Sequence, residues 1–304
     1  MKFPLLYHAV YCEPLCIDHD VFRSIHATLW PRITGGQGMD IGDAVAADVS
    51  KPVTNPYNGR RATKARPAVD PNTGRVMDDR FYSAVDGRPD LAVIPVYGIL
   101  AKNAGFMEEV CHGVTDINAI SHAVAQAAAA NEVKTLILDM ATPGGQVTGI
   151  PELANLVRAV TKMKGKTVYS FCDERCCSAG EWIASAADEK YVTQSSTTGS
   201  VGTYLAWLDE SVKMQLEGVR LEFFGAGKHK GMGLPGKALS QEDRTLLTAR
   251  VTEINQWFTS SVQANRPRIA EGTMEGQTFN GAEAVARGLA DGIVGSWEEF
   301  LSLI

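Results

Sequence analysis

The sequence predicts an α/β fold with a mostly parallel sheet, on two observations. Strand-like and helix-like segments alternate over residues 91–188. The helical segments between successive strands are long enough for right-handed βαβ crossovers, which produce parallel strands. Hydrophobic residues make up 45% of the 304 residues and charged residues 21%, proportions typical of a globular protein with a sizeable core.

The alternation begins with LAVIPVYGIL, an apolar run that predicts a strand. An Ala-rich segment, residues 117–133, follows with apolar spacing near 3.6 and predicts a helix. The next run, KTLILDMATPGG, is β-rich and ends in a turn. The unit closes with a helix, a strand and a second helix, which we expect at residues 151–164, 167–173 and 178–188.

The carboxyl-terminal part predicts fewer regular elements. Residues 190–205 are typical of a strand, a polar turn and a second strand. Residues 219–231 predict a strand that leads into a Gly-rich loop. From Ser240 the sequence SQEDRTLLTARVTEINQWF combines a Ser-x-x-Asp capping box with amphipathic spacing, which predicts a long helix.

We expect two parts in the chain: an amino-terminal arm with an irregular segment at residues 1–80, and one folded domain at residues 81–304. Residues 31–77 are rich in Gly, Pro, Asn and Asp and show little periodicity. This segment is locally basic, and either a solvated linker or a docking arm for an acidic partner fits it. Its cations are Lys51, Arg60, Arg61, Lys64 and Arg66.

Charge and hydropathy argue against nucleic-acid binding, membrane insertion and export. The net charge of −6 argues against a nucleic-acid binder. The longest apolar stretch, residues 91–101, is about half of what a membrane span requires. Glu13, Asp18 and Asp20 stand where a signal peptide would have its cleavage region, so we expect a cytoplasmic protein without a membrane segment.

The six cysteines predict reduced thiols, because no export signal accompanies them. Cys12, Cys16 and His19 have part of the spacing of a metal site, but a second pair of ligands is missing. We therefore expect small buried side chains there and no metal.

Four side chains in CDERCCSAGEW could act as nucleophiles: Cys172, Cys176, Cys177 and Ser178. Ser178 stands at the predicted start of a helix, where unpaired N–H groups face any negative charge that develops nearby. Ala179 and Gly180 leave room for a substrate backbone. A serine in this position is also a common N-cap, so both roles remain open.

A serine nucleophile needs a base, and acyl transfer needs donors for the oxyanion. His229 is the one histidine in a suitable loop, but Lys228 and Lys230 flank it and disfavour its charged form. A buried lysine with a lowered pKa is the other solution, so both lysines are candidates. Gly144 and Gly145 can present backbone N–H groups, although Pro-Gly-Gly alone is usually only a turn.

Four motifs stand in order along the chain: TPGG at residues 142–145, CSAGEWIASAAD at 177–188, TGSVG at 198–202 and GKHK at 227–230. Together they resemble the signal peptide peptidase A family of serine/lysine peptidases, especially its phage lambda-type capsid (prohead) protease branch. The resemblance covers residues 91–294. The spacing of 52 between Ser178 and Lys230 favours Lys230 over Lys228 as the base, since 230 − 178 = 52.

The resemblance implies a ClpP/crotonase-like βαβ spiral core that assembles into homo-oligomers. It implies that Ser178 attacks a peptide carbonyl, that Lys230 accepts its proton, and that the N–H groups of Gly145 and Ala179 bind the oxyanion, beside Gly144. Ser200 would orient the lysine, with Thr198 as a further supporting residue. No cofactor or metal is implied.

The substrates implied are scaffold and capsid-associated proteins inside the prohead, with possible contact to the portal or capsid. Three alternatives remain open at this point. The chain could be an inactive capsid-associated subunit with the same fold, a cytoplasmic bacterial signal-peptide-peptidase-like protease, or a crotonase-like acyl-CoA enzyme, which also binds an oxyanion with paired amides.

Overall fold

The structure is a computed structural model that describes residues 14–17, 68–69, 76–78, 81–85, 87–104, 114–234 and 236–304. Cys12, His19 and the basic residues 51–66 lie outside this part of the chain. Two short strands, β2 (Ala68–Val69) and β3 (Val76–Asp78), pair antiparallel within the segment expected to be irregular. The boundary at residues 80 and 81 stays a prediction.

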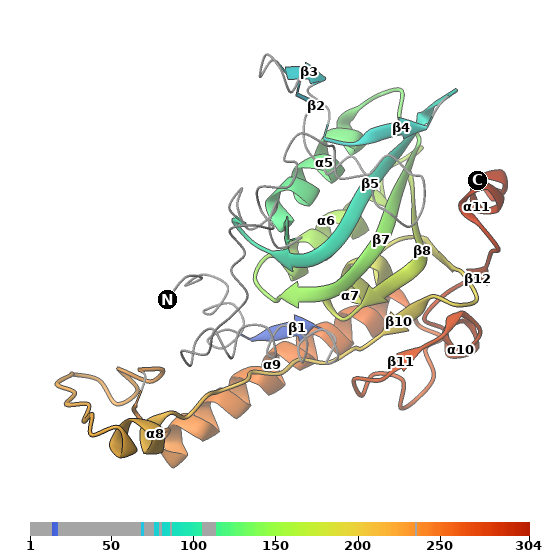
Figure 1. Cartoon of the computed structure of the whole chain (residues 1–304). Helices are drawn as coiled ribbons and strands as arrows, with labels where there is room; N and C mark the ends of the chain where they lie inside the picture. Colours follow the sequence, from blue (N-terminus) through green and yellow to red (C-terminus); the bar gives the residue numbers. More distant parts are fainter. Residues whose placement is uncertain are drawn as a thin grey trace, which may run out of the picture.

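A sheet of ten strands, counted over the described residues, forms the centre of the molecule (Figure 1). Three long strands lie side by side in it and run parallel: β5 (Arg88–Ala101), β7 (Thr135–Gln146) and β8 (Thr167–Cys177). Their parallel pairing confirms the predicted fold class. Three further pairings are also parallel. They add β6 (Val114–Asp116), β9 (Glu189–Val192) and β10 (Thr197–Gly199).

The sheet margins are antiparallel or short. Strand β4 (Ser83–Val85) pairs antiparallel with β5, and β11 (Thr278–Phe279) pairs antiparallel with β10. A short amino-terminal strand, β1 (Leu15–Ile17), pairs antiparallel with the end of β7. β12 (Gly292–Ile293) lies parallel to β9.

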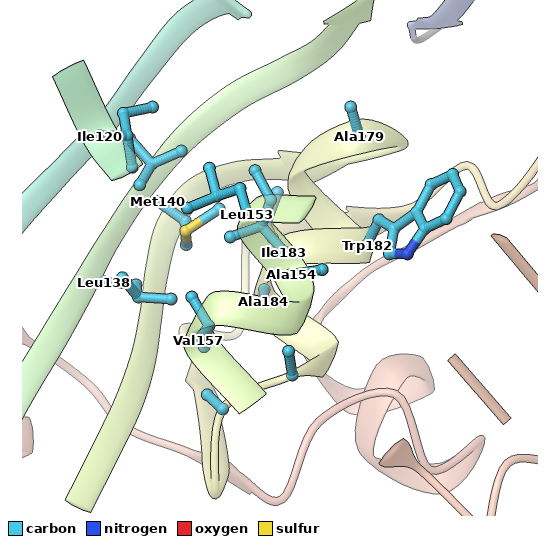
Figure 2. Close-up of a cluster of buried hydrophobic side chains, with 14 of the residues drawn as sticks. Ile120, Leu138, Met140, Leu153, Ala154, Val157, Ala179, Trp182, Ile183 and Ala184 are labelled. Atoms are coloured by element: carbon cyan, nitrogen blue, oxygen red, sulfur yellow. The ribbon is translucent and has the colours of Figure 1, made fainter. Parts of the chain in front are cut away.

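Helices α5 (Ile117–Ala129), α6 (Ile150–Val160) and α7 (Ala179–Ser185) form the main core with the sheet. Figure 2 shows this core, in which Ile120, Leu153 and Ile183 from the three helices gather near Leu138 and Met140 of β7. The other side chains of β7 alternate to the opposite face. There Ile137 packs with Phe171 and with Phe300 of α11 (Trp297–Leu303).

Helix α9 (Gln241–Asn265) begins at the predicted capping box, in which the Ser240 hydroxyl accepts from the Asp243 N–H at 3.0 Å. Farther along α9, Phe258 stacks on Trp182 of α7 with ring centroids 4.5 Å apart. This stack joins the helix that follows Ser178 to α9, the longest helix among the described residues. Helices α8 (Ser211–Leu216) and α10 (Gly281–Ala286) are short. In the described part of the chain, no helix is long and apolar enough to cross a membrane.

Two expectations differ from the structure. The predicted turn at residues 142–145 belongs to β7, and β8 continues to Cys177 instead of ending at Asp173. The strand predicted within residues 219–231 is absent, because its apolar side chains have no core to cover them. Phe224 is 90% exposed.

We expect Phe258→Ala to lower the free energy of unfolding by about 3–5 kcal/mol, because it removes a fully buried ring from its stack on Trp182. The control is Trp257→Ala, since Trp257 is the neighbouring aromatic residue and is 50% exposed. Urea unfolding measures both. Equal losses from the two variants would contradict the role given to the stack.

Candidate active site

Ser178 lies between the end of β8 and the start of α7, with φ 55° and ψ −116°. A positive φ is uncommon for a residue with a side chain and costs free energy that the surrounding packing must offset. The Ser178 side chain makes no N-cap hydrogen bond, so the N-cap interpretation of its hydroxyl is wrong. Its Oγ is buried and has no hydrogen-bond partner among the described residues.

The backbone fixes this turn from both sides. The Ser178 N–H donates to the Gly199 carbonyl at 2.8 Å, and the Ser178 carbonyl accepts from the Trp182 N–H at 3.0 Å. Strand β10 runs parallel to β8 up to Gly199, opposite Cys177. The predicted TGSVG motif therefore holds the predicted nucleophile in place.

The end of β7 at residues 142–145 packs directly on Ser178. Gly144 has φ +101°, and a Cβ atom there would lie 2.9 Å from the Ser178 Cβ. A Cβ atom at Gly180 would lie 2.4 Å from the Thr142 Cγ2. Position 180 therefore requires glycine. Position 179 accommodates alanine, whose side chain is fully buried.

The amides near Ser178 are not equivalent as oxyanion donors. The Thr142 hydroxyl accepts from the Gly144 N–H at 3.0 Å and donates to the Gly98 carbonyl at 2.6 Å, so the Gly144 amide is engaged. Ala179 is the first residue of α7, and its N–H is one that a helix leaves without an intrahelical partner. The geometry therefore favours Ala179, and disfavours Gly144, as a donor.

The sequence interpretation missed a buried ion pair beside this turn. Lys190 Nζ donates to Glu181 Oε2 at 2.5 Å, and both side chains have no exposed surface. The Thr198 hydroxyl contacts both groups and donates to the Cys176 carbonyl at 3.0 Å. The same carboxylate oxygen accepts from the Gly199 N–H at 3.3 Å. The sequence did contain a sign of this pair: Glu181 stands three residues after the candidate serine, and Lys190 stands in the strand that follows the helix.

Lys190 is the fully buried lysine of the described residues, but it is not available as a base. Burial alone would lower its pKa, but Cys176 and the Glu181 carboxylate outweigh this effect and raise the pKa of the ammonium above its ordinary value. Lys190 therefore stays charged. Glu181 holds Thr198 and Gly199, and Gly199 holds Ser178, so the pair acts on Ser178 through positioning.

The neighbouring cysteines are unsuited to nucleophilic attack. Burial raises the pKa of Cys176 to about 12 and that of Cys172 well above its ordinary value, so both stay thiols. Cys177 is also fully buried. No group of three His, Cys, Asp or Glu side chains among the described residues is placed to hold a metal ion.

The basic loop lies elsewhere on the chain. His229 Nδ1 is 2.7 Å from Asp243 Oδ1 in the first turn of α9. The hydrogen bonds of Asp243 with His229 and with the Ser240 hydroxyl lower the pKa of Asp243 to about 2. Lys228 Nζ lies 3.7 Å from Glu242, and Lys230 is exposed. The loop thus sits with α8 at the amino-terminal end of α9, away from α7 (Figure 1).

The length of α9 separates the loop from Ser178. Asp243, which holds His229, and Phe258, which stacks on Trp182, are fifteen residues apart because 258 − 243 = 15. At 1.5 Å per residue this is about 22 Å along the axis. That span exceeds the reach of a lysine side chain. Within one chain, the structure brings Ser178 together with residues 142–145 and Ala179, but not with Lys228 or Lys230.

A cleft of about 450 Å³ opens beside the turn, between residues 200–204, α9 and residues 274–276. Ser200 lines it and has φ 52°, and its N–H donates to the Gln277 carbonyl at 2.6 Å. Asn255 Oδ1, also on the lining, is buried without a hydrogen-bond partner among the described residues. The cleft therefore offers Asn255 Oδ1 as a polar acceptor on the wall that α9 forms.

We expect Glu181→Gln and Lys190→Met each to destabilise the fold by about 3–5 kcal/mol, because each leaves one buried group unpaired. The double variant Glu181→Leu/Lys190→Met should regain most of this stability. It should still react more slowly with a fluorophosphonate at Ser178, because Thr198 and Gly199 lose their shared partner.

The control for this prediction is Phe300→Ala, which removes a buried ring from the opposite face of the sheet without touching Glu181, Lys190 or Thr198. It should change stability but leave the labelling rate of the folded protein unchanged. Thermal melts and intact-mass spectrometry give the two readouts. A double variant that labels as fast as the parent would make the Glu181 pair purely structural.

Comparison with known proteins identifies a family and several relatives. The model for peptidase family S49 matches residues 161–302. Capsid assembly protease C of Escherichia phage lambda is 32% identical over 219 residues, which cover 71% of this chain and 48% of the relative. Head-tail preconnector protein GP5 of Enterobacteria phage P21 is 29% identical over 217 residues, 71% of this chain and 42% of the relative.

A putative signal peptide peptidase SppA of Enterococcus faecium is 28% identical over 166 residues, 53% of this chain and 47% of the relative. The chain spans about half the length of these curated relatives. The matched residues include Ser178, the buried ion pair and the basic loop. The chain therefore carries a peptidase family S49 domain, which confirms the family predicted from its motifs.

Proposed function

We propose that the protein is a serine endopeptidase and that Ser178 is its nucleophile. One observation carries this proposal: Ser178 is held at positive φ between a strand and a helix, against the two glycines at the end of β7, and its buried hydroxyl has no hydrogen-bond partner among the described residues. A structural serine has no need of this costly conformation. The family of the domain and the names of its relatives support the same class of activity.

In the proposed reaction, Ser178 Oγ attacks the carbonyl carbon of a peptide bond while a lysine amine takes the hydroxyl proton. The N–H groups of Ala179 and Gly145 donate to the oxyanion. The lysine then gives its proton to the leaving amine, and an acyl-enzyme remains. Water, deprotonated by the same lysine, attacks the ester and releases the acid and Ser178.

We assign the base to Lys230 of a neighbouring copy, with Lys228 as the alternative. Within one chain the loop is too far from Ser178, so a complete dyad requires a second subunit. The segment that carries the loop has exposed apolar side chains, among them Leu216 at 84% and Phe224 at 90% exposed. Apolar surface of this kind is typical of an interface, and a homo-oligomer would cover it.

For the substrates we propose scaffold and capsid-associated proteins of a phage prohead, in the cytoplasm of the host. The support is the pair of phage relatives, one named a capsid assembly protease and the other a head-tail preconnector. The competing candidate is a catalytically inactive capsid-associated subunit. The buried Ser178 hydroxyl and the distant lysines of a single chain favour it if no oligomer completes the site.

Mixing two inactive variants tests the proposal. Ser178→Ala and Lys230→Ala should each reduce cleavage of a co-expressed scaffold protein at least a hundredfold, because each lacks one member of the dyad. Subunits mixed from both variants should regain part of the activity, since a Ser178 of one can meet a Lys230 of the other. Mass spectrometry of the scaffold fragments measures the cleavage.

The matched control for this mixture is Lys228→Ala, which should keep most of the activity if Lys230 is the base. A reversed pattern would assign the base to Lys228. Scaffold processing by Ser178→Ala at the parent rate would refute the peptidase proposal. Full loss without recovery in the mixture would place the dyad within one subunit.

A further inference from the structure

At the candidate active site, one edge of β7 stops pairing with β8 and pairs with a different strand. Strand β8 pairs with β7 only as far as Cys176, opposite Thr142, before the chain turns at Ser178 into α7. From Gly144 to Gln146 the same edge of β7 is left to another strand. On the far side, residues 200–204 continue from β10. A slot one strand wide therefore opens beside Ser178.

Strand β1 fills this slot. It pairs antiparallel with β7, with Leu15 opposite Gln146, Cys16 opposite Gly145 and Ile17 opposite Gly144. On its other edge, the Leu15 N–H donates to the Tyr204 carbonyl at 2.8 Å, and the Tyr204 N–H donates to the Leu15 carbonyl at 3.1 Å. All three side chains of β1 are at most 5% exposed. Figure 1 shows β1 at the carboxyl end of β7.

The alternation of an antiparallel ladder sets the direction of the Cys16 peptide groups. Because both peptide groups of Leu15 face Tyr204, those of Cys16 face β7 at Gly145. A Cβ atom at Gly144 would lie 2.1 Å from the Cys16 carbonyl oxygen, so this carbonyl lies directly against Gly144. The Cys16 backbone thus occupies the position where the proposed reaction needs a substrate carbonyl.

The side chain of Cys16 lies on the Ser178 hydroxyl. Burial raises the pKa of the Cys16 thiol to about 12, and the nearby hydroxyls of Thr203 and Ser178 partly offset this. The thiol and the Ser178 hydroxyl do not form a hydrogen bond of ordinary geometry. Ser178 is 1% exposed, so no protein substrate can reach it while β1 is in place.

We propose that the slot between β7 and Tyr204 is the binding site for an extended peptide strand, and that β1 is an autoinhibitory strand of the chain's own amino-terminal segment that must leave before a substrate binds. This inference rests on the proposed function. Main-chain hydrogen bonds to both walls give such a site affinity without a strict sequence preference.

The short length of β1 is consistent with its displacement from the slot by a substrate. It has three residues, so it forms few backbone hydrogen bonds with the two walls of the slot. A longer substrate strand forms the same bonds and more, so it can displace β1. Leu15, Cys16 and Ile17 are apolar, which predicts a preference for small or aliphatic side chains at the corresponding substrate positions.

A peptide-binding measurement tests the inference apart from catalysis, because all chains carry Ser178→Ala. The probe is a fluorescein-labelled peptide with the sequence of residues 11–20, YCEPLCIDHD, under reducing conditions. We expect Leu15→Asp, which places a charge in a buried position, to bind the probe at least tenfold more tightly than the Ser178→Ala parent. Fluorescence anisotropy measures the affinity.

Two further variants keep this test decisive. Leu15→Pro removes the N–H that donates to Tyr204 without adding a charge, and it should act in the same direction. Val85→Asp, on β4 at another margin of the sheet, should leave probe binding at the parent level. Equal binding by the parent, Leu15→Asp and Leu15→Pro would overturn the inference, as would an equal gain from Val85→Asp.

The same substitutions with Ser178 intact separate the two proposals. We expect Leu15→Asp to cleave the scaffold protein at least tenfold faster than the parent. Tighter probe binding without cleavage by any chain would support the strand site and refute the peptidase function. Cleavage that does not change with Leu15→Asp, together with unchanged probe binding, would support the peptidase and refute the autoinhibitory strand.

Discussion

The close approach of the end of β7, at residues 142–145, to the start of α7, at residues 178–180, is the constraint on which the rest of the site depends. Gly180 has no room for a Cβ atom against Thr142, and Gly144 has none against Ser178. Ser178 has a positive φ at this contact, and the first amide of α7 lies beside Gly144. The stack of Trp182 on Phe258 and the Glu181 pair then hold α7 in that place.

In the proposed mechanism, one chain supplies the nucleophile and the oxyanion donors, and a neighbouring copy supplies the base. Ser178 and the amides lie in the core, whereas the lysines lie at the far end of α9 on a segment with uncovered apolar side chains. The proposed mechanism thereby makes proteolysis depend on oligomerisation. The proposed autoinhibitory role of β1 adds a second condition, the release of this strand from the slot.

The βαβ order, the capping box at Ser240 and the turn at Ser178 could be predicted, because each follows from local periodicity or from residue types at fixed spacing. Other features depend on tertiary contacts. Asp173 gives no sign that β8 runs on to Cys177, and residues 219–224 have strand composition but no sheet edge to join. The place of β1 joins residues far apart in sequence, and the pair of Glu181 and Lys190 forms between a helix and the following strand; periodicity reports neither contact.

The central claim is that the strained Ser178 is the nucleophile, and locating a covalent adduct tests it most directly. The purified Leu15→Asp variant, in which the proposed autoinhibitory strand is released from the slot, is treated exhaustively with a fluorophosphonate, digested, and analysed by tandem mass spectrometry. The account predicts one adduct per chain, on Ser178, and none after denaturation before treatment. An adduct on a cysteine or on another serine, or no adduct on the folded variant, would contradict it.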